Sequence, residues 1–319
     1  MIKKYNLFLI NEGITFSNDD IIDIIRSLES EDNKNSALIK KLVNHADKSG
    51  KNVLMNIVQT GDYELVDYVL KFDVDINHKT KIGENVLFFC KSIKMFKKFY
   101  DLGVDAHAMN NKRNVLSYLS SKNLFNAELY QKLIDDGIDI NQKNTYTVNG
   151  HTYYDDSVLF CSLLNKTIVE LLIKNGVNLN DPDTQKFCFN KLFDTFKYSE
   201  NKKKIVLNMF SILFNNGMKI IDEINFSKGV STLNLYNINI DVILDFVSPL
   251  KEYFSENLII LIWEKFPDMK NSKKLLNLDL YPSLYKRVKS WFGDKNFYEH
   301  FADYVAEHPY IDASGKYNL

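Results

Sequence analysis

Apolar positions recur along the middle of the chain in short helical stripes that glycines and polar turns separate. In the clearest stretch, apolar residues fill most of 53–58, and a Gly-Asp pair interrupts them at 61–62. Leu and Val then follow an i, i+1, i+4, i+5 spacing over 65–70. This spacing places the second set on one face of a helix. The pattern therefore predicts a short helix over 53–60 and a second helix over 63–72.

The same pattern returns at intervals near 33 residues. The tripeptide Asn-Val-Leu begins at Asn52, Asn85 and Asn114, and Ser-Val-Leu begins at Ser157, so the spacings are 33, 29 and 43 residues. A closing phrase of Gly, then Val or Ile, then Asp or Asn keeps the same phase at 103–105, 137–139 and 176–178. Two signals in step indicate an array of helical repeats, each with a short helix, a tight turn, a longer helix and an extended loop.

Further helix pairs follow from the same spacing. They are expected at 86–91 with 93–102, at 115–120 with 126–136, and at 158–164 with 167–175. The periodic pattern continues, with a less close match, in a fifth helix pair at 186–197 and 205–215 and in a sixth unit near 229–247. A glycine follows each of three second helices, at the position where the chain adopts a left-handed conformation that glycine takes most easily.

The residues that define the first unit also match a known repeat pattern position for position. They are Asp47, Gly50, Leu54, Gly61, Val66, Leu70, Asp75 and Asn77. With these residues, and with Ile-Val-Glu-Leu-Leu-Ile-Lys-Asn-Gly at 168–176, the block resembles the ankyrin repeat. The resemblance covers 47–180, weakens over 181–250 and does not extend further.

The chain departs from the ankyrin pattern at the start of each first helix. Asn-Val or Ser-Val replaces the family's Thr-Pro, and its His position holds Met55, Phe88, Ser117 or Phe160. Asn and Ser can still cap a helix. The rigid proline and the inter-repeat hydrogen bonds of the histidine are missing, so the resemblance implies a less regular array than a consensus one.

About ten residues, 145–154, are inserted between the third and fourth units. They place β-forming residues on both sides of Asn149-Gly150, which is the strongest short-range hairpin signal. A projecting β-finger is expected. Its Tyr146, Tyr153 and Tyr154 are read either as cross-strand pairs or as contact residues for a partner.

The predicted fold class is all-α, an ankyrin-like helical repeat solenoid with helical caps and one inserted β-hairpin finger. Residues 1–46 form an N-terminal helical cap, 47–250 hold about six units, and 251–319 form a C-terminal helical cap or a small helical domain. Terminal units of a solenoid need a polar outer face, which accounts for the acidic residues near the N-terminus.

Composition narrows the class of function. Hydrophobic residues make up 45% and charged residues 25%, and the net charge is −1. These values describe a folded protein and disfavour a nucleic-acid binder with a broad basic surface. No stretch reaches the length of a membrane span and none reads as a signal peptide. The three cysteines, set among apolar neighbours, indicate reduced thiols and a cytoplasmic location.

The sequence offers little support for catalysis. Phosphate-binding loops, dinucleotide fingerprints, the His-Glu-x-x-His motif and Cys-x-x-Cys are all missing. His300, Asp303 and Glu307 could share one helix face with His308 beside them, but a solvated face explains them better than a metal site. A Ser-x-x-Lys match at 283–286 lacks companion motifs. We therefore expect no enzyme activity, no cofactor and no metal.

The function predicted from these features is that of a protein–protein interaction scaffold that inhibits or sequesters its partner. The resemblance implies contacts from loop tips and first helices, and the finger extends the same edge. The expected contact residues are Lys48, Ser49, Lys51, Gln59, Thr60, Lys79, Lys81, Ile82, Glu84, Gln142, Lys143, Tyr146, His151, Tyr153 and Tyr154. The lysines among them favour a partner with an acidic surface.

Three further readings stay open. An Asn-, Lys- and Ile-rich composition suggests an AT-rich genome, and hence a phage or pathogen protein that acts on a host defence component in the host cytosol. The array could instead be a targeting arm for an enzymatic or nucleic-acid-binding module in the C-terminal region, where 265–295 is basic and aromatic. The acidic and basic ends could also associate to form a homo-oligomer.

Overall fold

The computed structural model describes most of the chain between residues 36 and 221. The described residues are 22–23, 25–26, 36–110, 113–148, 151–155, 157–196, 200–221, 223, 226, 229, 250, 253–255 and 258. They are predominantly helical, which confirms the all-α class. The chain divides into two compact units, Met1–Val177 and Asn178–Leu319.

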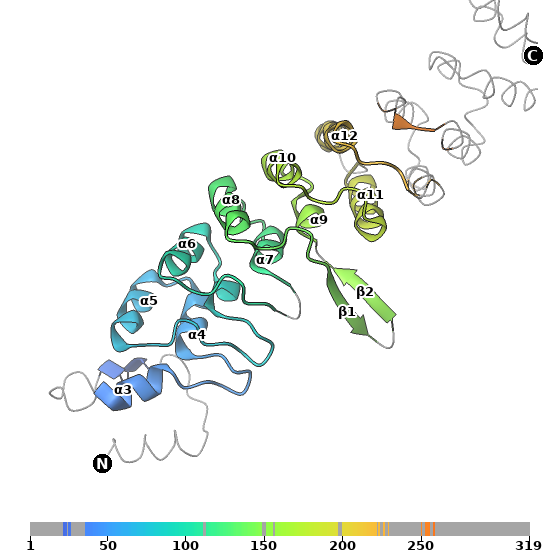
Figure 1. Cartoon of the computed structure of the whole chain (residues 1–319). Coiled ribbons are helices and arrows are strands. Elements are labelled where there is room, and N and C mark those ends of the chain that lie inside the picture. The colour runs from blue at the N-terminus through green and yellow to red at the C-terminus, as the bar shows by residue number, and fades with distance from the viewer. Residues whose placement is uncertain are drawn as a thin grey trace, which may run out of the picture. The chain divides into compact units, whose positions relative to one another are not determined.

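The first unit consists of helices in pairs. Its elements are α3 (Ser36–Val43), α4 (Val53–Thr60), α5 (Tyr63–Val69) continued by η1 (Leu70–Phe72), η2 (Val86–Phe89), α6 (Ile93–Asp101), α7 (Val115–Ser121), α8 (Ala127–Asp135), α9 (Val158–Ser162) and α10 (Lys166–Lys174). Figure 1 shows α4, α7 and α9 in one row and α5, α6, α8 and α10 in a second row. The core lies between the rows, where the apolar side chains of the helices in both rows are buried.

Each first-row helix begins at the residue that the sequence pattern singled out. The side chain of Asn52 accepts a hydrogen bond from the Met55 N–H at 3.0 Å, and Ser157 accepts one from Phe160. Asn85 and Asn114 cap η2 and α7 in the same way. These caps satisfy N–H groups that a helix leaves free at its start, which is why Asn and Ser suffice without proline.

The three capping asparagines have a second role that the sequence did not reveal. The Nδ2 group of Asn52 donates to the Asp75 carbonyl at 3.2 Å, and Asn85 and Asn114 donate to the Asp105 and Asp139 carbonyls, each at 2.6 Å. Each asparagine therefore ties the start of a first helix to the extended loop beyond the second helix.

The extended loops are also linked to one another. The Asp75 N–H donates to Asn44 Oδ1, and the Asp105 N–H donates to Asn77 Oδ1, both at 2.7 Å. In the second unit, Asn180 accepts from the Lys219 N–H at 2.8 Å. The side-chain oxygens of Asn77 and Asn180 in the closing phrases therefore accept hydrogen bonds from backbone N–H groups of the next loop along the chain.

A small group of hydroxyls is buried between α7, α8 and α9. The Ser120 hydroxyl donates to the Leu116 carbonyl, lies 3.0 Å from the Tyr130 hydroxyl and accepts from Ser162 at 3.2 Å. Ser117, on the same helix and fully buried, has no partner for its hydroxyl among the described residues. Of these two buried serine hydroxyls on α7, that of Ser120 is hydrogen-bonded, whereas that of Ser117 has no hydrogen-bond partner in the described structure.

The second unit has a core of aromatic rings. Its described helices are α11 (Pro182–Phe196) and α12 (Glu200–Asn215). Phe226 lies edge-on to Phe189 and Phe193, with centroids 4.9 and 5.2 Å apart, and Phe210 stacks on Phe214 at 5.7 Å. Such aromatic contacts add stabilisation beyond burial alone.

Three of the predicted helices differ from the structure. The helix expected at 205–215 is α12, which begins five residues earlier, at Glu200. The other two differ for local reasons. The helix expected at 86–91 is the 3₁₀ helix η2, because Ser92 caps the next helix only three residues after η2 ends. The helix expected at 186–197 begins four residues earlier, at Pro182, because Asp181 accepts from the Thr184 N–H. Proline suits the first position of a helix, where no hydrogen bond is needed from its nitrogen.

Two antiparallel strands follow α8. β1 (Asn144–Val148) pairs with β2 (His151–Asp155), with Tyr146 opposite Tyr153 and Val148 opposite His151. The Asn149-Gly150 turn lies outside the described residues. The same holds for the predicted sixth unit apart from Gly229, for most of the N-terminal cap before residue 36, and for 251–319 except 253–255 and 258.

Candidate functional site

Three loops run between the helix pairs of the first unit, and their outer ends are called tip loops below. They comprise residues 46–52, 78–85 and 108–114, with 111–112 outside the described residues. In Figure 1 these loops and the β1–β2 hairpin extend on the side of α4, α7 and α9. Seven of the fifteen contact residues predicted from the sequence belong to the first two tip loops.

The first tip loop folds around Asp47. Its Oδ1 accepts from the Ser49 N–H at 2.8 Å, the Ser49 hydroxyl at 2.6 Å and the Lys51 N–H at 3.0 Å. Burial alone would raise the pKa of Asp47, but these hydrogen bonds lower it below the ordinary value. The anionic carboxylate therefore fixes the loop that presents Lys48.

The second tip loop closes on Thr80 and Glu84. The Thr80 N–H donates to the Glu84 carbonyl at 2.8 Å, and Asn110 from the third tip loop donates to the Glu84 carboxylate at 2.5 Å. Burial raises the pKa of Glu84, while the nearby Lys51 ammonium and the bonds from Thr80 and Asn110 act against that rise. Glu84 thus supports the tip loops from within.

The first two tip loops contact each other through the His78 ring and through their backbones. The His78 ring nitrogen Nε2 lies 2.8 Å from the Gly50 carbonyl, and the Lys81 N–H donates to the Ser49 carbonyl at 3.5 Å. A Cβ on Gly50 would come within 2.9 Å of the Lys81 nitrogen, and one on Gly83 within 2.6 Å of the Met109 carbonyl oxygen. Both glycines also have positive φ, +87° for Gly50 and +89° for Gly83, so no other residue fits easily.

The predicted lysines differ in how much charge they offer to a partner. Lys79 forms an ion pair with Asp105 at 3.0 Å, and the half-buried Lys51 places its ammonium 4.9 Å from the centre of the Phe89 ring. Lys48 and Lys81 are exposed, and neither has an ion-pair partner within the described ranges. Their loops meet at the backbone contact between Ser49 and Lys81.

The structure therefore brings together part of the predicted set. Lys48, Ser49, Lys81 and Ile82 form one exposed strip on two adjoining tips, which is called the tip surface below, and the Ile82 side chain is 47% exposed. Gln59 lies 3.4 Å from the Lys51 ammonium, and the Thr60 hydroxyl donates to the Ile57 carbonyl. Both are exposed at the end of α4, apart from the strip.

The remaining predicted residues lie near or on the hairpin. Gln142 is half-buried and donates to the Lys143 carbonyl at 3.2 Å, while Lys143 is exposed. Tyr146, His151, Tyr153 and Tyr154 lie on β1 and β2, and only their backbone register is described. Phe89, Asn110 and Met109 support the tips and were missed, because their roles depend on neighbours 26 to 38 residues away in the sequence.

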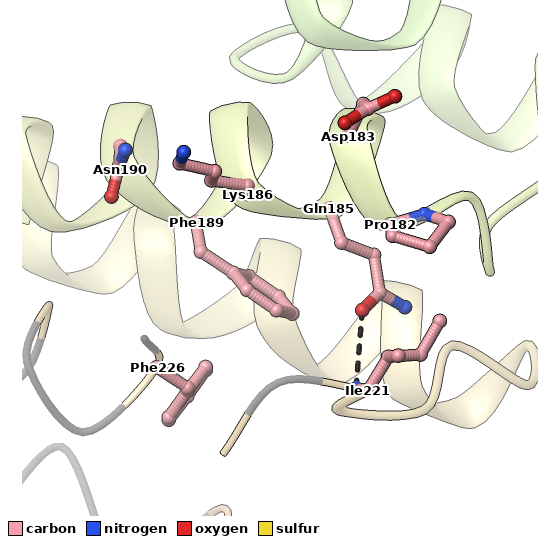
Figure 2. Close-up of a pocket in the computed structure, with 8 residues that line it drawn as sticks. All are labelled: Pro182, Asp183, Gln185, Lys186, Phe189, Asn190, Ile221 and Phe226. Atoms are coloured by element: carbon pink, nitrogen blue, oxygen red, sulfur yellow. Dashed lines mark hydrogen bonds between the residues drawn. The ribbon is translucent and has the colours of Figure 1, made fainter. Parts of the chain in front are cut away.

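A separate pocket of about 260 Å³ lies in the second unit (Figure 2). Phe189 and Phe226 form its apolar part, and Lys186 lies at its border. Gln185 accepts from the Ile221 N–H at 3.3 Å and donates to the Leu179 carbonyl, so it is already satisfied. The described residues of this pocket leave no buried polar group unpaired that could orient a ligand.

Other kinds of site find no support among the described residues. No cluster of three or more His, Cys, Asp or Glu side chains suits a metal there, and the His300 to His308 group lies outside them. Cys90, Cys161 and Cys188 are buried free thiols, as predicted, and burial raises the pKa of Cys90. Within the same residues, no helix combines the length and apolar character that crossing a bilayer requires.

Comparison with known proteins adds no assignment. No protein-family model matches the chain, and no curated protein matches it.

Proposed function

We propose that this chain is a non-catalytic, ankyrin-like helical repeat solenoid that binds a protein partner through the tip surface. The observation that carries the proposal is the backbone contact between the first two tip loops. It holds Lys48, Ser49, Lys81 and Ile82 in one fixed, exposed strip. Preorganised loops lose little conformational freedom on binding, so more of the contact energy is available as affinity.

The chemistry of the tip surface defines the partner. The ammonium groups of Lys48 and Lys81, which have no ion pairs in the described structure, belong to the same strip as the exposed Ile82 side chain. The matching surface has carboxylates close to a small apolar depression, so that charges guide the encounter and Ile82 supplies the buried anchor. Lys79 contributes less than the sequence suggested, because Asp105 already neutralises it.

The biological effect follows from occupancy of the partner. A chain that covers an acidic surface on another protein inhibits or sequesters that protein without chemistry of its own. The composition that points to an AT-rich genome extends this proposal to a phage or pathogen protein acting on a host defence component in the host cytosol. The hairpin and residues 142–143 extend the binding edge in the same proposal.

The test is affinity capture with a charge-reversed tip surface. The double variant Lys48→Glu and Lys81→Glu should weaken capture of the partner at least ~10-fold, since two complementary charges become repulsive. Lys51 is left unchanged because its contact with Phe89 is structural. The melting temperature should stay within a few degrees, because neither lysine forms an ion pair in the described structure.

A matched control separates local recognition from net charge. Lys91→Glu with Lys122→Glu makes the same change in net charge on exposed residues, in the turns that follow η2 and α7 and away from the tip loops. This control should capture the partner as the unmodified protein does. Equal capture by the tip variant and the unmodified protein would refute the proposal.

A further inference from the structure

The hairpin of β1 and β2 has two open edges. In the part of the chain that the structure describes, no third strand joins this sheet. Each edge of a two-stranded sheet leaves a row of unpaired N–H and C=O groups, and such an edge is a template for another strand. A hairpin without further strands is also only marginally stable in water. Both facts favour a partner strand.

The register shows which backbone groups line each edge. Val148 and His151 flank a two-residue connection, so they form a hydrogen-bonded pair, and such pairs alternate with non-hydrogen-bonded pairs along the hairpin. The next non-hydrogen-bonded pairs are Thr147 with Thr152 and Thr145 with Tyr154. Thr145 and Thr147 therefore turn their N–H and C=O groups outward from β1.

β1 lacks the features that usually protect an edge strand. Its sequence, Asn-Thr-Tyr-Thr-Val, contains no charged residue, no proline and no glycine, and four of its five residues favour strands. β2 differs because it carries His151 and Asp155. The β1 edge is therefore the one that accepts another strand most readily.

We propose that the β1 edge pairs antiparallel with β1 of a second copy of this chain, about a two-fold axis at Tyr146. In that register Thr145 lies opposite Thr147 of the second copy, and Thr147 lies opposite its Thr145. All four residues have outward-facing backbone groups, so both pairs are hydrogen-bonded pairs. The strand is thus complementary to itself, as an isologous two-fold interface requires.

The resulting four-stranded sheet aligns tyrosines across its strands. Tyr153 pairs with Tyr146 within each hairpin, and Tyr146 meets its own copy at the axis. These positions share one face, where aromatic cross-strand neighbours stabilise a sheet. The contact is far smaller than a standard interface, so the dimer is weak and forms at high protein concentration. This association uses the backbone groups of the β1 edge, whereas partner binding is centred on the tip surface.

The test is sedimentation velocity on the full chain from about 1 μM to about 1 mM, the range in which small interfaces dissociate. The sedimentation coefficient should rise from the monomer value toward the dimer value. Thr147→Pro removes an outward N–H from the β1 edge and should abolish the rise. Thr147→Val keeps the N–H and should dimerise as the unmodified chain does, and Thr152→Pro, on the β2 edge, should also dimerise.

Two further measurements keep the proposal falsifiable if proline disturbs the hairpin. Deletion of 145–154 restores the 33-residue spacing between Asn114 and Ser157 and should give a monomer at every concentration. High salt, which screens charged contacts, should leave the dimer of the unmodified chain intact. An unmodified chain that stays monomeric, dimerisation of Thr147→Pro or the deletion variant, or loss of the dimer in high salt would overturn the inference.

Discussion

Replacing Asn114 with serine separates the two hydrogen bonds that this side chain makes. Asn114 is almost fully buried, accepts from the Ser117 N–H at 3.0 Å and donates to the Asp139 carbonyl at 2.6 Å. Serine caps a helix as well as asparagine does, but it has no group that reaches the loop. Asn114→Ser should therefore lower the free energy of unfolding by about 1–2 kcal/mol, the cost of losing a buried hydrogen bond.

Asn126→Ser is the matched control. Asn126 caps α8 through the Leu129 N–H at 2.8 Å, and its Nδ2 group has no partner among the described residues. The same substitution there should change the free energy of unfolding by only a few tenths of a kcal/mol. Urea unfolding followed by circular dichroism measures both variants. Equal stability of Asn114→Ser and the unmodified protein would refute the linking role.

Asn114→Asp adds a pH dependence with a defined sign. The introduced carboxylate keeps the cap but faces the Asp139 carbonyl without a proton to donate, so the folded state should raise the pKa of this new carboxyl group above its unfolded value near ~3.9. The penalty should be absent below the unfolded pKa and appear as pH rises through the folded pKa. Stability curves of this variant that run parallel to those of the unmodified protein from pH 3 to pH 8 would contradict the geometry.

Three further predictions concern other buried or constrained positions. Ser117→Ala should leave the free energy of unfolding unchanged or raise it, because it removes a buried hydroxyl without a partner in the described structure. Ser120→Ala should instead lower the free energy of unfolding, measured in urea, by about 1–2 kcal/mol, because it removes the hydroxyl that lies next to the Tyr130 hydroxyl. Gly83→Ala should destabilise more than Gly137→Ala: both have positive φ, but a Cβ on Gly83 meets the Met109 carbonyl, and one on Gly137 meets nothing within 4 Å. Asp47→Asn should flatten the acid limb of the stability profile, because the lowered pKa of Asp47 gives stability above the unfolded pKa that is lost as pH falls through the folded value.

The periodic part of the fold was readable from the sequence, because each element has a local signal. Asn52 and Ser157 were identified as caps, and the structure places helix starts there. The second bond of each capping asparagine was not readable, because its acceptor lies 20 to 25 residues further along the chain. The early start of α11 could have been read from Asp181-Pro182, a cap followed by proline.

The tip surface was predicted only in part for a similar reason. Lys48 and Lys81 were identified as contact residues, but nothing local shows that Asp105 neutralises Lys79 or that Phe89 holds Lys51. Pairing between side chains of successive loops depends on the stacking of the loops. Sequence periodicity gives the order of the loops but not which charges cancel.

Site-specific photo-crosslinking tests the proposed binding surface most directly. A photoreactive residue placed at Ile82 or Lys48 in the full chain should form a covalent adduct with the captured partner, whereas the same residue at Lys91 or Lys122 should not. Adducts from the control positions as strong as those from Ile82, or none from the tip surface while the partner is still captured, would contradict the account.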